Sequence, residues 1–166
     1  MVVVSGTLIY MARKNWRSKA LLTVTCLACQ IAMGTLGCGV GTSLSTHAFY
    51  MLTHVNAWHL LCNLLVLWSI KGRMETKSAL AIAFLASYIP TLNSGVTAGL
   101  SGVLFALFGI MWGRTGRLGE CLKKGLPVIV LTMVLPGVNG LLHLYCYLIG
   151  YVWGWLRSCF RFLIFS

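Results

Sequence analysis

Three long tracts without charge limit the folds open to this chain. They cover Ala20–Ile70, Ser78–Gly113 and Gly125–Leu156, and they are 51, 36 and 32 residues long. A helix of 36 residues is about 54 Å long, whereas the hydrocarbon core of a bilayer is about 30 Å thick. Each tract is therefore predicted to fold back on itself where polar or helix-breaking residues gather. These predicted turns lie at residues 42–56, 90–95 and 136–139.

The composition and the positions of the charges predict a multi-span membrane protein. Hydrophobic residues make up 58% of the chain and charged residues only 9%. All 13 basic residues lie between the tracts or at the chain ends, and none lies in a mid-tract turn. Because basic loops stay cytoplasmic, each tract begins and ends on that side and holds two spans. The formal charge of +11 is then explained by topology and anionic lipid, and nucleic acid is not expected as a partner.

The predicted fold class is an all-α membrane protein, a bundle of six transmembrane helices over residues 20–157. Residues 1–19 and 158–166 are expected to be cytoplasmic tails, and the membrane is expected to be a prokaryotic cytoplasmic membrane. The six expected spans are Ala20–Val40, Ala57–Ile70, Ser78–Ile89, Gly99–Trp112, Gly125–Leu135 and Asn139–Leu156.

The fourth expected span opens with Gly99-Leu100-Ser101-Gly102. At 14 residues it is about 21 Å long, which is too short to cross the core, so its start is expected to be recessed. Water would then reach Ser101 through a cavity below the external surface. A serine among small residues at the point where a loop becomes a helix is a candidate nucleophile.

Two polar residues of the second span, His59 and Asn63, are one helical turn apart and share a face. Lipid offers neither side chain a partner, so both are expected to point into the protein. Two interpretations of the pair remain open: the side chains cross-link neighbouring helices by hydrogen bonds, or they have a functional role. Their place near the external end, level with Ser101, favours function.

The sixth span contains His143, followed on the same face by Gly150 and Gly154. Glycines at this spacing leave a groove in which another helix backbone can come close. The expected partner is the Gly102 and Gly109 face of the fourth span. That packing would bring His143 onto Ser101.

These residues supply the groups that peptide hydrolysis needs. Ser101 is the candidate nucleophile and His143 the candidate base, while Asn63, His59 and the backbone N–H of Ser101 are the candidate oxyanion donors. The only carboxylates, Glu75 and Glu120, lie in loops on the cytoplasmic side, so a Ser-His-Asp triad is excluded. A dyad remains, which needs no metal and no cofactor.

Phe105, one turn after Ser101, is expected to hold the imidazole of His143 by stacking on it.

Three motifs together resemble the rhomboid family of intramembrane serine proteases over about Thr53–Trp155. They are His54-x-x-x-x-His59-x-x-x-Asn63, Gly99-Leu100-Ser101-Gly102, and His143 with Gly150 and Gly154 after it. Gly72-x-x-Glu75 also resembles a glycine and a glutamate of that family. The resemblance implies a dyad of Ser101 and His143, with His59 and Asn63 at the oxyanion. It implies supporting roles for His54, Gly99, Gly102, Phe105 and Gly150. Substrates would be single-span membrane proteins cut near their external end.

Three features depart from the family pattern. Phe105 stands where some members have tyrosine, which keeps the stacking ring and loses its hydroxyl. Cys146 replaces a small glycine and is unfavourable to close packing of the fourth and sixth spans. The first external loop has only about 15 residues, so the substrate gate is expected to differ.

Two alternative functions stay open at the level of sequence. One is a catalytically inactive rhomboid-like protein that binds membrane helices. The other is a membrane metal or haem protein that uses His54, His59, His143 and Cys146 as ligands.

Overall fold

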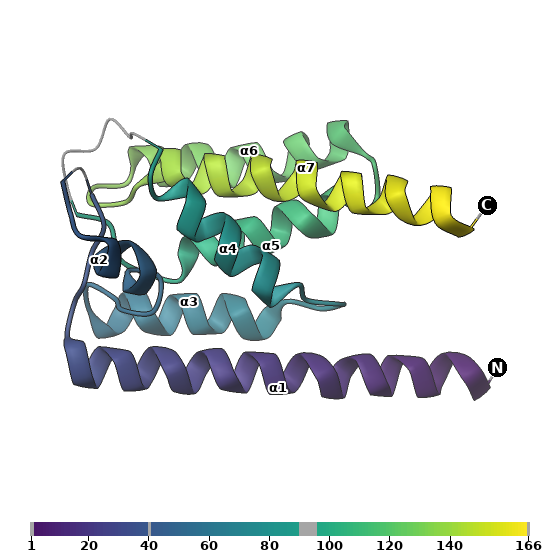
Figure 1. The fold of residues 1–166 in the computed structure, drawn as a ribbon, viewed down its shortest axis with the longest axis horizontal. Helices are drawn as coiled ribbons and strands as arrows, with labels where there is room; N and C mark the ends of the chain where they lie inside the picture. Colours follow the sequence, from purple (N-terminus) through teal and green to yellow (C-terminus); the bar gives the residue numbers. More distant parts are fainter. Residues whose placement is uncertain (1, 40, 90–95, 166) are drawn as a thin grey trace.

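The fold was established from a computed structural model of the chain. It describes residues 2–39, 41–89 and 96–165, without the side chains of residues 2–14, 161, 162, 164 and 165. The described residues form seven helices and one isolated β-bridge (Figure 1). The helices are α1 (Val2–Met33), α2 (Leu44–Phe49), α3 (Ala57–Ser69), α4 (Thr76–Ala86), α5 (Ser101–Gly113), α6 (Leu118–Val134) and α7 (Gly140–Phe165).

The expected all-α fold is confirmed, and the expected number of helices is corrected. Each of the six expected spans overlaps one of the longer helices, and α2 is a seventh, short helix in the predicted loop at 42–56. A stretch of six residues has no room for an apolar tract, so hydropathy gave no indication of it. The turn expected at 90–95 lies outside the described residues.

Three helices extend beyond the expected spans. Helix α1 begins at Val2 rather than Ala20, α6 begins at Leu118 rather than Gly125, and α7 continues to Phe165. The span limits were set at charged residues, but lysine, arginine and glutamate are good helix formers, so backbone hydrogen bonding continues through them. The limits of the proposed tails, at residues 19 and 158, therefore fall inside α1 and α7.

Within the described part of the chain, no helix is both long enough and apolar enough to cross a membrane.

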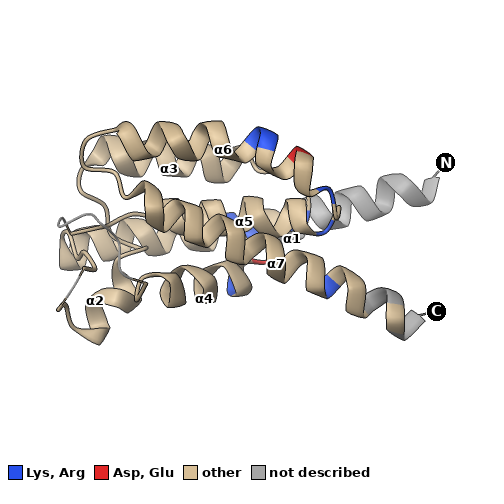
Figure 2. Cartoon of the chain, turned by 90° about the horizontal axis from the view of Figure 1, so that it is seen from above, with Lys and Arg blue, Asp and Glu red and all other residues tan. Residues whose placement is uncertain are grey.

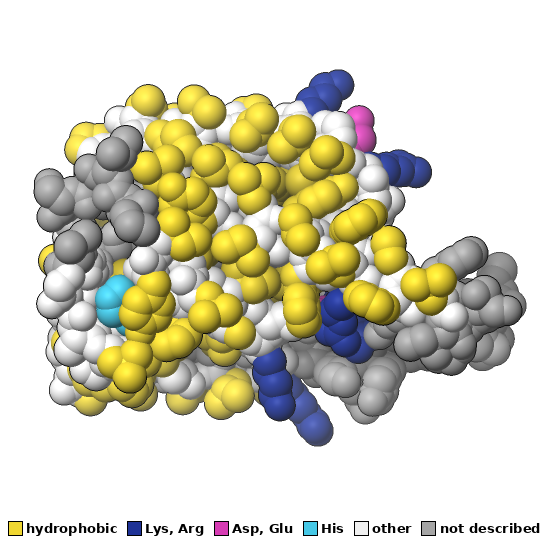
Figure 3. Space-filling model, turned by 45° about the horizontal axis from the view of Figure 1, so that its top comes forward, with side chains coloured by type: hydrophobic (Ala, Val, Ile, Leu, Met, Phe, Trp, Pro, Cys, Tyr) yellow, Lys and Arg dark blue, Asp and Glu magenta, His cyan; other side chains and the backbone are white. Residues whose placement is uncertain are grey.

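Large apolar side chains are exposed over much of the surface. Figure 3 shows one face on which they are widespread. Ile31, Trp58, Val134 and Leu163 are between 71% and 86% exposed. Proteins that are surrounded only by water rarely expose so much apolar surface.

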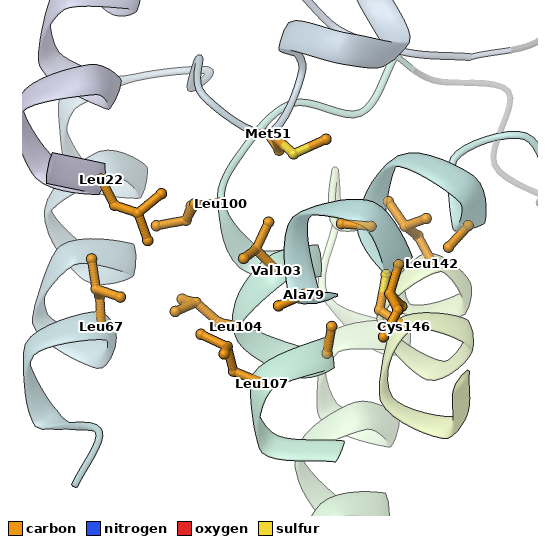
Figure 4. Close-up of a cluster of buried hydrophobic side chains, with 14 of the residues drawn as sticks. Leu22, Met51, Leu67, Ala79, Leu100, Val103, Leu104, Leu107, Leu142 and Cys146 are labelled. Carbon is orange, nitrogen blue, oxygen red and sulfur yellow. The ribbon is translucent and has the colours of Figure 1, made fainter. Parts of the chain in front are cut away.

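Helix α5 is the centre of the bundle. Eight of its 13 residues are buried. Its Val103, Leu104 and Leu107 meet apolar side chains from several other helices (Figure 4). These include Leu22 of α1, Leu67 of α3, Ala79 of α4, and Leu142 and Cys146 of α7. Ser101 therefore stands at the start of the helix around which the core is built.

Helices α5 and α7 pack backbone against backbone. A Cβ atom at Gly109 would lie 2.1 Å from the carbonyl oxygen of Tyr147, and one at Gly150 would lie 2.5 Å from that of Ala106. Gly113 and Gly154 repeat the pattern one turn along, at 2.1 Å and 2.3 Å. The expected Gly150 and Gly154 face thus meets α5.

Gly102 also faces α7, as expected, but less closely than the other glycines. A Cβ atom there would face the hydroxyl of Tyr50 at 3.2 Å and Sγ of Cys146 at 3.4 Å. Cys146 is fully buried beside Gly102. The close packing of α5 and α7 is therefore kept with a cysteine at this position.

The charged residues lie towards the end of the molecule that carries the two termini, and none is coloured at the end that carries α2 (Figure 2). Here Glu75, just before α4, pairs with Arg114 after α5 and, at 2.7 Å, with Arg157 of α7. Burial alone would raise the pKa of the Glu75 carboxyl, but the hydrogen bonds from the two guanidinium groups outweigh it and hold that pKa below its usual value. The carboxylate ties three helices together at the end away from Ser101.

Candidate active site

Glycine is the only residue type that fits position 99, in the turn before Ser101. The φ of Gly99 is +134°, a value that side chains other than glycine rarely adopt. A Cβ atom there would lie 2.5 Å from Cε1 of His59 and 3.4 Å from Nδ2 of Asn63. The missing side chain therefore lets the loop backbone rest directly against both polar residues of α3.

The segment before Ser101 is hydrogen-bonded at three positions to the chain between α1 and α3. Thr97 exchanges two backbone hydrogen bonds with Cys38, at 2.8 Å and 2.9 Å. The N–H of Gly99 donates to the carbonyl of Tyr50 at 2.8 Å, and the N–H of Leu100 donates to Nε2 of His54 at 3.2 Å. This connecting segment thus sets where α5 begins.

His54 holds this segment as a neutral ring. Its side chain is fully buried, and burial, followed by the neighbouring His59 ring, lowers the pKa of His54 to about 4. Nε2 therefore keeps its lone pair at neutral pH and accepts the hydrogen bond from Leu100. The structure places His54 behind the turn that leads into Ser101, where it supports that turn.

Ser101 and His143 lie in direct contact. Nε2 of His143 is 2.8 Å from Oγ of Ser101. The imidazole also stacks on Phe105, with ring centroids 4.5 Å apart and planes inclined by 19°. His143 is 3% exposed. The two residues predicted as nucleophile and base are thus brought together, with the predicted stacking partner beside them.

Thr132 of α6 is a third contact of the imidazole and was missed at the level of sequence. Its Oγ1 lies 3.1 Å from Nδ1 of His143. Sequence did hold an indication of it, because Thr132 is the only polar side chain between Gly125 and Leu135. A lone hydroxyl in an apolar stretch needs a partner inside the protein.

Asn139, the residue directly before α7, was also missed as a contributor to the site. Its Nδ2 donates to Oγ1 of Thr97 at 2.9 Å, and its Oδ1 accepts from the N–H of Leu142 at 3.1 Å. Thr97 stands four residues before Ser101, and Asn139 stands four residues before His143. The bond between them joins the two segments that lead into the dyad.

The two candidate oxyanion residues lie on α3 beside this turn. Asn63 is 6% exposed, and its Nδ2 atom is buried without a hydrogen-bond partner in the described part of the chain. The backbone N–H of His59 donates to the side chain of Asn56 at 2.8 Å, while its ring lies against Gly99. Because an unsatisfied buried donor is costly, the Asn63 amide can donate favourably to an oxygen atom that enters the site.

A cavity of about 640 Å³ opens over the dyad between α3, α5, α6 and α7. Its lining includes the polar residues Ser101, His143, His59 and Asn63, together with apolar side chains such as Phe108, Val128 and Trp112. A largely apolar cavity with a small number of polar groups is typical of a ligand-binding site.

The four residues considered as metal ligands do not form one cluster. No group of three or more His, Cys, Asp or Glu side chains converges within the described ranges. Nε2 of His54 and Nε2 of His143 are both engaged, with Leu100 and Ser101. The site instead brings together a hydroxyl, an imidazole and an amide N–H donor without a partner in the described part of the chain. These are the groups that acyl transfer uses.

The family model of the rhomboid domain matches residues 41–160, which is more than half of the chain. The matched range contains the dyad, the turn at Gly99 and both candidate oxyanion residues.

Proposed function

Because this chain belongs to the rhomboid family, we propose that it is an intramembrane serine endopeptidase whose catalytic dyad is Ser101 and His143. The family is generally one of membrane-integral serine proteases that act on transmembrane substrates within the bilayer, and it also has inactive members. The observation that carries the proposal is the 2.8 Å contact between Nε2 of His143 and Oγ of Ser101 inside a cavity.

In the first step Ser101 attacks the scissile carbonyl and Nε2 of His143 takes the hydroxyl proton. The C–N bond then breaks as His143 returns that proton to the leaving amine, which leaves an acyl-enzyme on Ser101. Water then attacks the ester as His143 takes one of its protons, and His143 returns that proton to Oγ of Ser101 as the ester C–O bond breaks and the product acid leaves. Proton and leaving group are accounted for by the dyad and one water.

The negative charge that develops on the carbonyl oxygen needs donors aimed at it. Nδ2 of Asn63, the ring of His59 and the backbone N–H of Ser101 are the proposed donors. The unpartnered amide of Asn63 supports this role, because a purely structural amide would be expected to have found a partner.

The proposed setting is a prokaryotic cytoplasmic membrane that the chain crosses six times over residues 20–157. Both tails are proposed to be cytoplasmic. Exposed apolar surface and the gathering of Lys and Arg towards the end with the termini support this orientation. The proposed substrates are single-span proteins, cut near their external end.

The dyad is tested with the variants Ser101→Ala, His143→Ala and their combination. Each single variant should abolish cleavage of a model single-span substrate in lipid vesicles, and the double variant should be hardly worse, because the two groups act as a unit. Labelling by a fluorophosphonate should disappear in the same variants. Wild-type protein that binds transmembrane helices but neither cleaves nor labels would instead establish an inactive member.

Asn63→Ala tests the oxyanion role. Loss of one oxyanion donor costs on the order of a hundredfold in kcat while the fold remains. A fall in kcat that only follows the folded fraction, measured by thermal unfolding, would assign Asn63 to helix cross-linking.

A further inference from the structure

We infer that Thr132 is a positioning residue for His143, which holds the proton of the neutral imidazole on Nδ1 so that Nε2 can accept the proton of Ser101. The inference rests on the proposed function, since it concerns how the base of the dyad is prepared. It gives a role to α6, a helix that carries neither residue of the dyad.

The hydrogen atoms around Thr132 can be assigned from the distances. Oγ1 of Thr132 lies 2.7 Å from the carbonyl oxygen of Ile129, which only accepts, so the hydroxyl hydrogen points there. The same oxygen lies 3.1 Å from Nδ1 of His143 and has only lone pairs left to offer. Nδ1 must therefore be the donor in this contact.

A neutral imidazole has a hydrogen on only one of its two nitrogens, so a protonated Nδ1 leaves Nε2 with a free lone pair. Nε2 is the atom that lies 2.8 Å from Oγ of Ser101. With the other tautomer, Thr132 could donate to Nδ1 only by giving up its hydrogen bond to the carbonyl of Ile129, and Nε2 could no longer accept. The contact with Thr132 thus favours the one tautomer that can act as a base.

In a Ser-His-Asp triad a carboxylate holds the imidazole in this way. Here the two carboxylates are engaged elsewhere, since Glu75 pairs with two arginines and Glu120 lies 3.6 Å from Lys124. A neutral hydroxyl does the same orienting work without burying a charge in the bundle. Phe105 fixes the plane of the ring by stacking, and Thr132 fixes which nitrogen is protonated.

The contact also makes the base depend on where α6 lies. The residues around Thr132 mostly face outward, with Val130 54%, Leu131 56% and Val134 71% exposed, and Ile129 is the buried exception. Pro127 removes a backbone hydrogen bond from the helix just before this stretch. Thr132 contacts His143 only while this part of α6 lies against α7.

The inference is tested by Thr132→Val, which keeps the branched shape and removes the hydroxyl, and by Thr132→Ser, which restores it. In lipid vesicles, Thr132→Val should lower kcat by about ten- to hundredfold. The KM for a single-span substrate should stay within about twofold, and Thr132→Ser should recover most of kcat.

Thr115→Val is the matched control. Its hydroxyl donates to the carbonyl of Trp112, three residues earlier, at 2.7 Å, as that of Thr132 does to Ile129. Thr115 is exposed and lies just after α5, at the opposite end of that helix from Ser101. It should leave kcat unchanged. A Thr132→Val protein with wild-type kcat would overturn the inference.

Nitrogen-15 NMR of histidine-labelled protein supplies a readout independent of proteolysis. The His143 resonances, assigned by their loss in His143→Gln, should show hydrogen on Nδ1 in the wild type and a mixture of tautomers in Thr132→Val. An unchanged tautomer in Thr132→Val would overturn the inference. If the wild type cleaves no substrate, the proposed function fails, and the NMR comparison still decides whether Thr132 positions the ring.

Discussion

Helices α5 and α7 meet through their backbones along several turns, whereas α6 meets its neighbours mostly through side chains and approaches the α7 backbone closely only at Gly140 within the described residues. At Gly109, Gly113, Gly150 and Gly154 there is no room for even one methyl group. On α6 only Cys121 and Ile129 are buried, and a Cβ atom at Gly119 would meet nothing within 4 Å. The close pair sets the distance between Ser101 and His143, because each residue stands on one of its helices. The looser helix supplies the wall of the cavity and one hydroxyl.

The largest effect is expected where the backbones touch. Gly109→Ala should lower the free energy of unfolding by about 3 kcal/mol, because the new methyl group meets the backbone of α7 at 2.1 Å and only a helix shift can relieve the clash. Gly119→Ala on α6 should be neutral or stabilising by up to about 1 kcal/mol. Thermal unfolding in detergent measures both. Equal stability of the two variants would remove the contrast between the helices.

The stacking contact should come next in size. Phe105→Leu keeps an apolar side chain but loses the flat partner of His143, and kcat should fall by about tenfold, which corresponds to about 1.4 kcal/mol. Phe105→Tyr should retain activity because the ring remains. Phe84→Leu on α4 is the control for lost aromatic volume, and it should change stability without changing kcat beyond the folded fraction. A similar loss of kcat in both leucine variants would point to general packing.

A smaller effect is expected at the main polar contact of α6 with α7. The hydroxyl of Tyr147 donates to the carbonyl of Cys121 at 2.8 Å, next to Gly125, where a side chain would not fit. Tyr147→Phe should cost about 1 kcal/mol of stability and loosen α6 rather than α5. Hydrogen exchange measured by mass spectrometry should rise first in residues 118–134. Tyr151→Phe is the control, and faster exchange confined to α5 would contradict the comparison.

The smallest effect concerns the ion pairs at the end away from the dyad. The lowered pKa of Glu75 means that its pairs with Arg114 and Arg157 stabilise the fold fully above about pH 4.5 and are lost as the pH falls through the folded-state pKa. The contribution should be below about 1 kcal/mol because both arginines are partly exposed. Unfolding midpoints should therefore fall on acidification below pH 4.5, and this part of the fall should vanish in Glu75→Gln.

Glu120→Gln is the matched control for that variant. Glu120 pairs with Lys124 within α6 itself, four residues away and well exposed, so it joins no two helices. A pH dependence that disappears in Glu120→Gln and persists in Glu75→Gln would reverse the assignment.

Local features of the sequence predicted most of the chemistry. A glycine two residues before Ser101 and a histidine at the start of the last apolar stretch were visible as motifs. The one-turn spacing of His59 and Asn63 placed both on a common face, and the structure has both beside Gly99. Six of the seven helices were also expected, because long charge-free tracts must fold back. In each case the property is carried by residues within one or two helical turns of one another.

Other features became visible only in three dimensions. The helix ends at Val2, Leu118 and Phe165 were missed because charges mark the limit of an apolar layer and not the end of backbone hydrogen bonding. The link between Thr97 and Asn139 joins residues 42 positions apart, and the contact between Thr132 and His143 depends on how α6 lies against α7.

Sequence thus determined which groups are present and on which helix face each one stands, since helical periodicity is a local property. Tertiary structure decided which nitrogen of His143 meets which hydroxyl. That choice depends on the packing of three helices, and single hydrogen bonds between distant residues leave no periodic pattern in the chain.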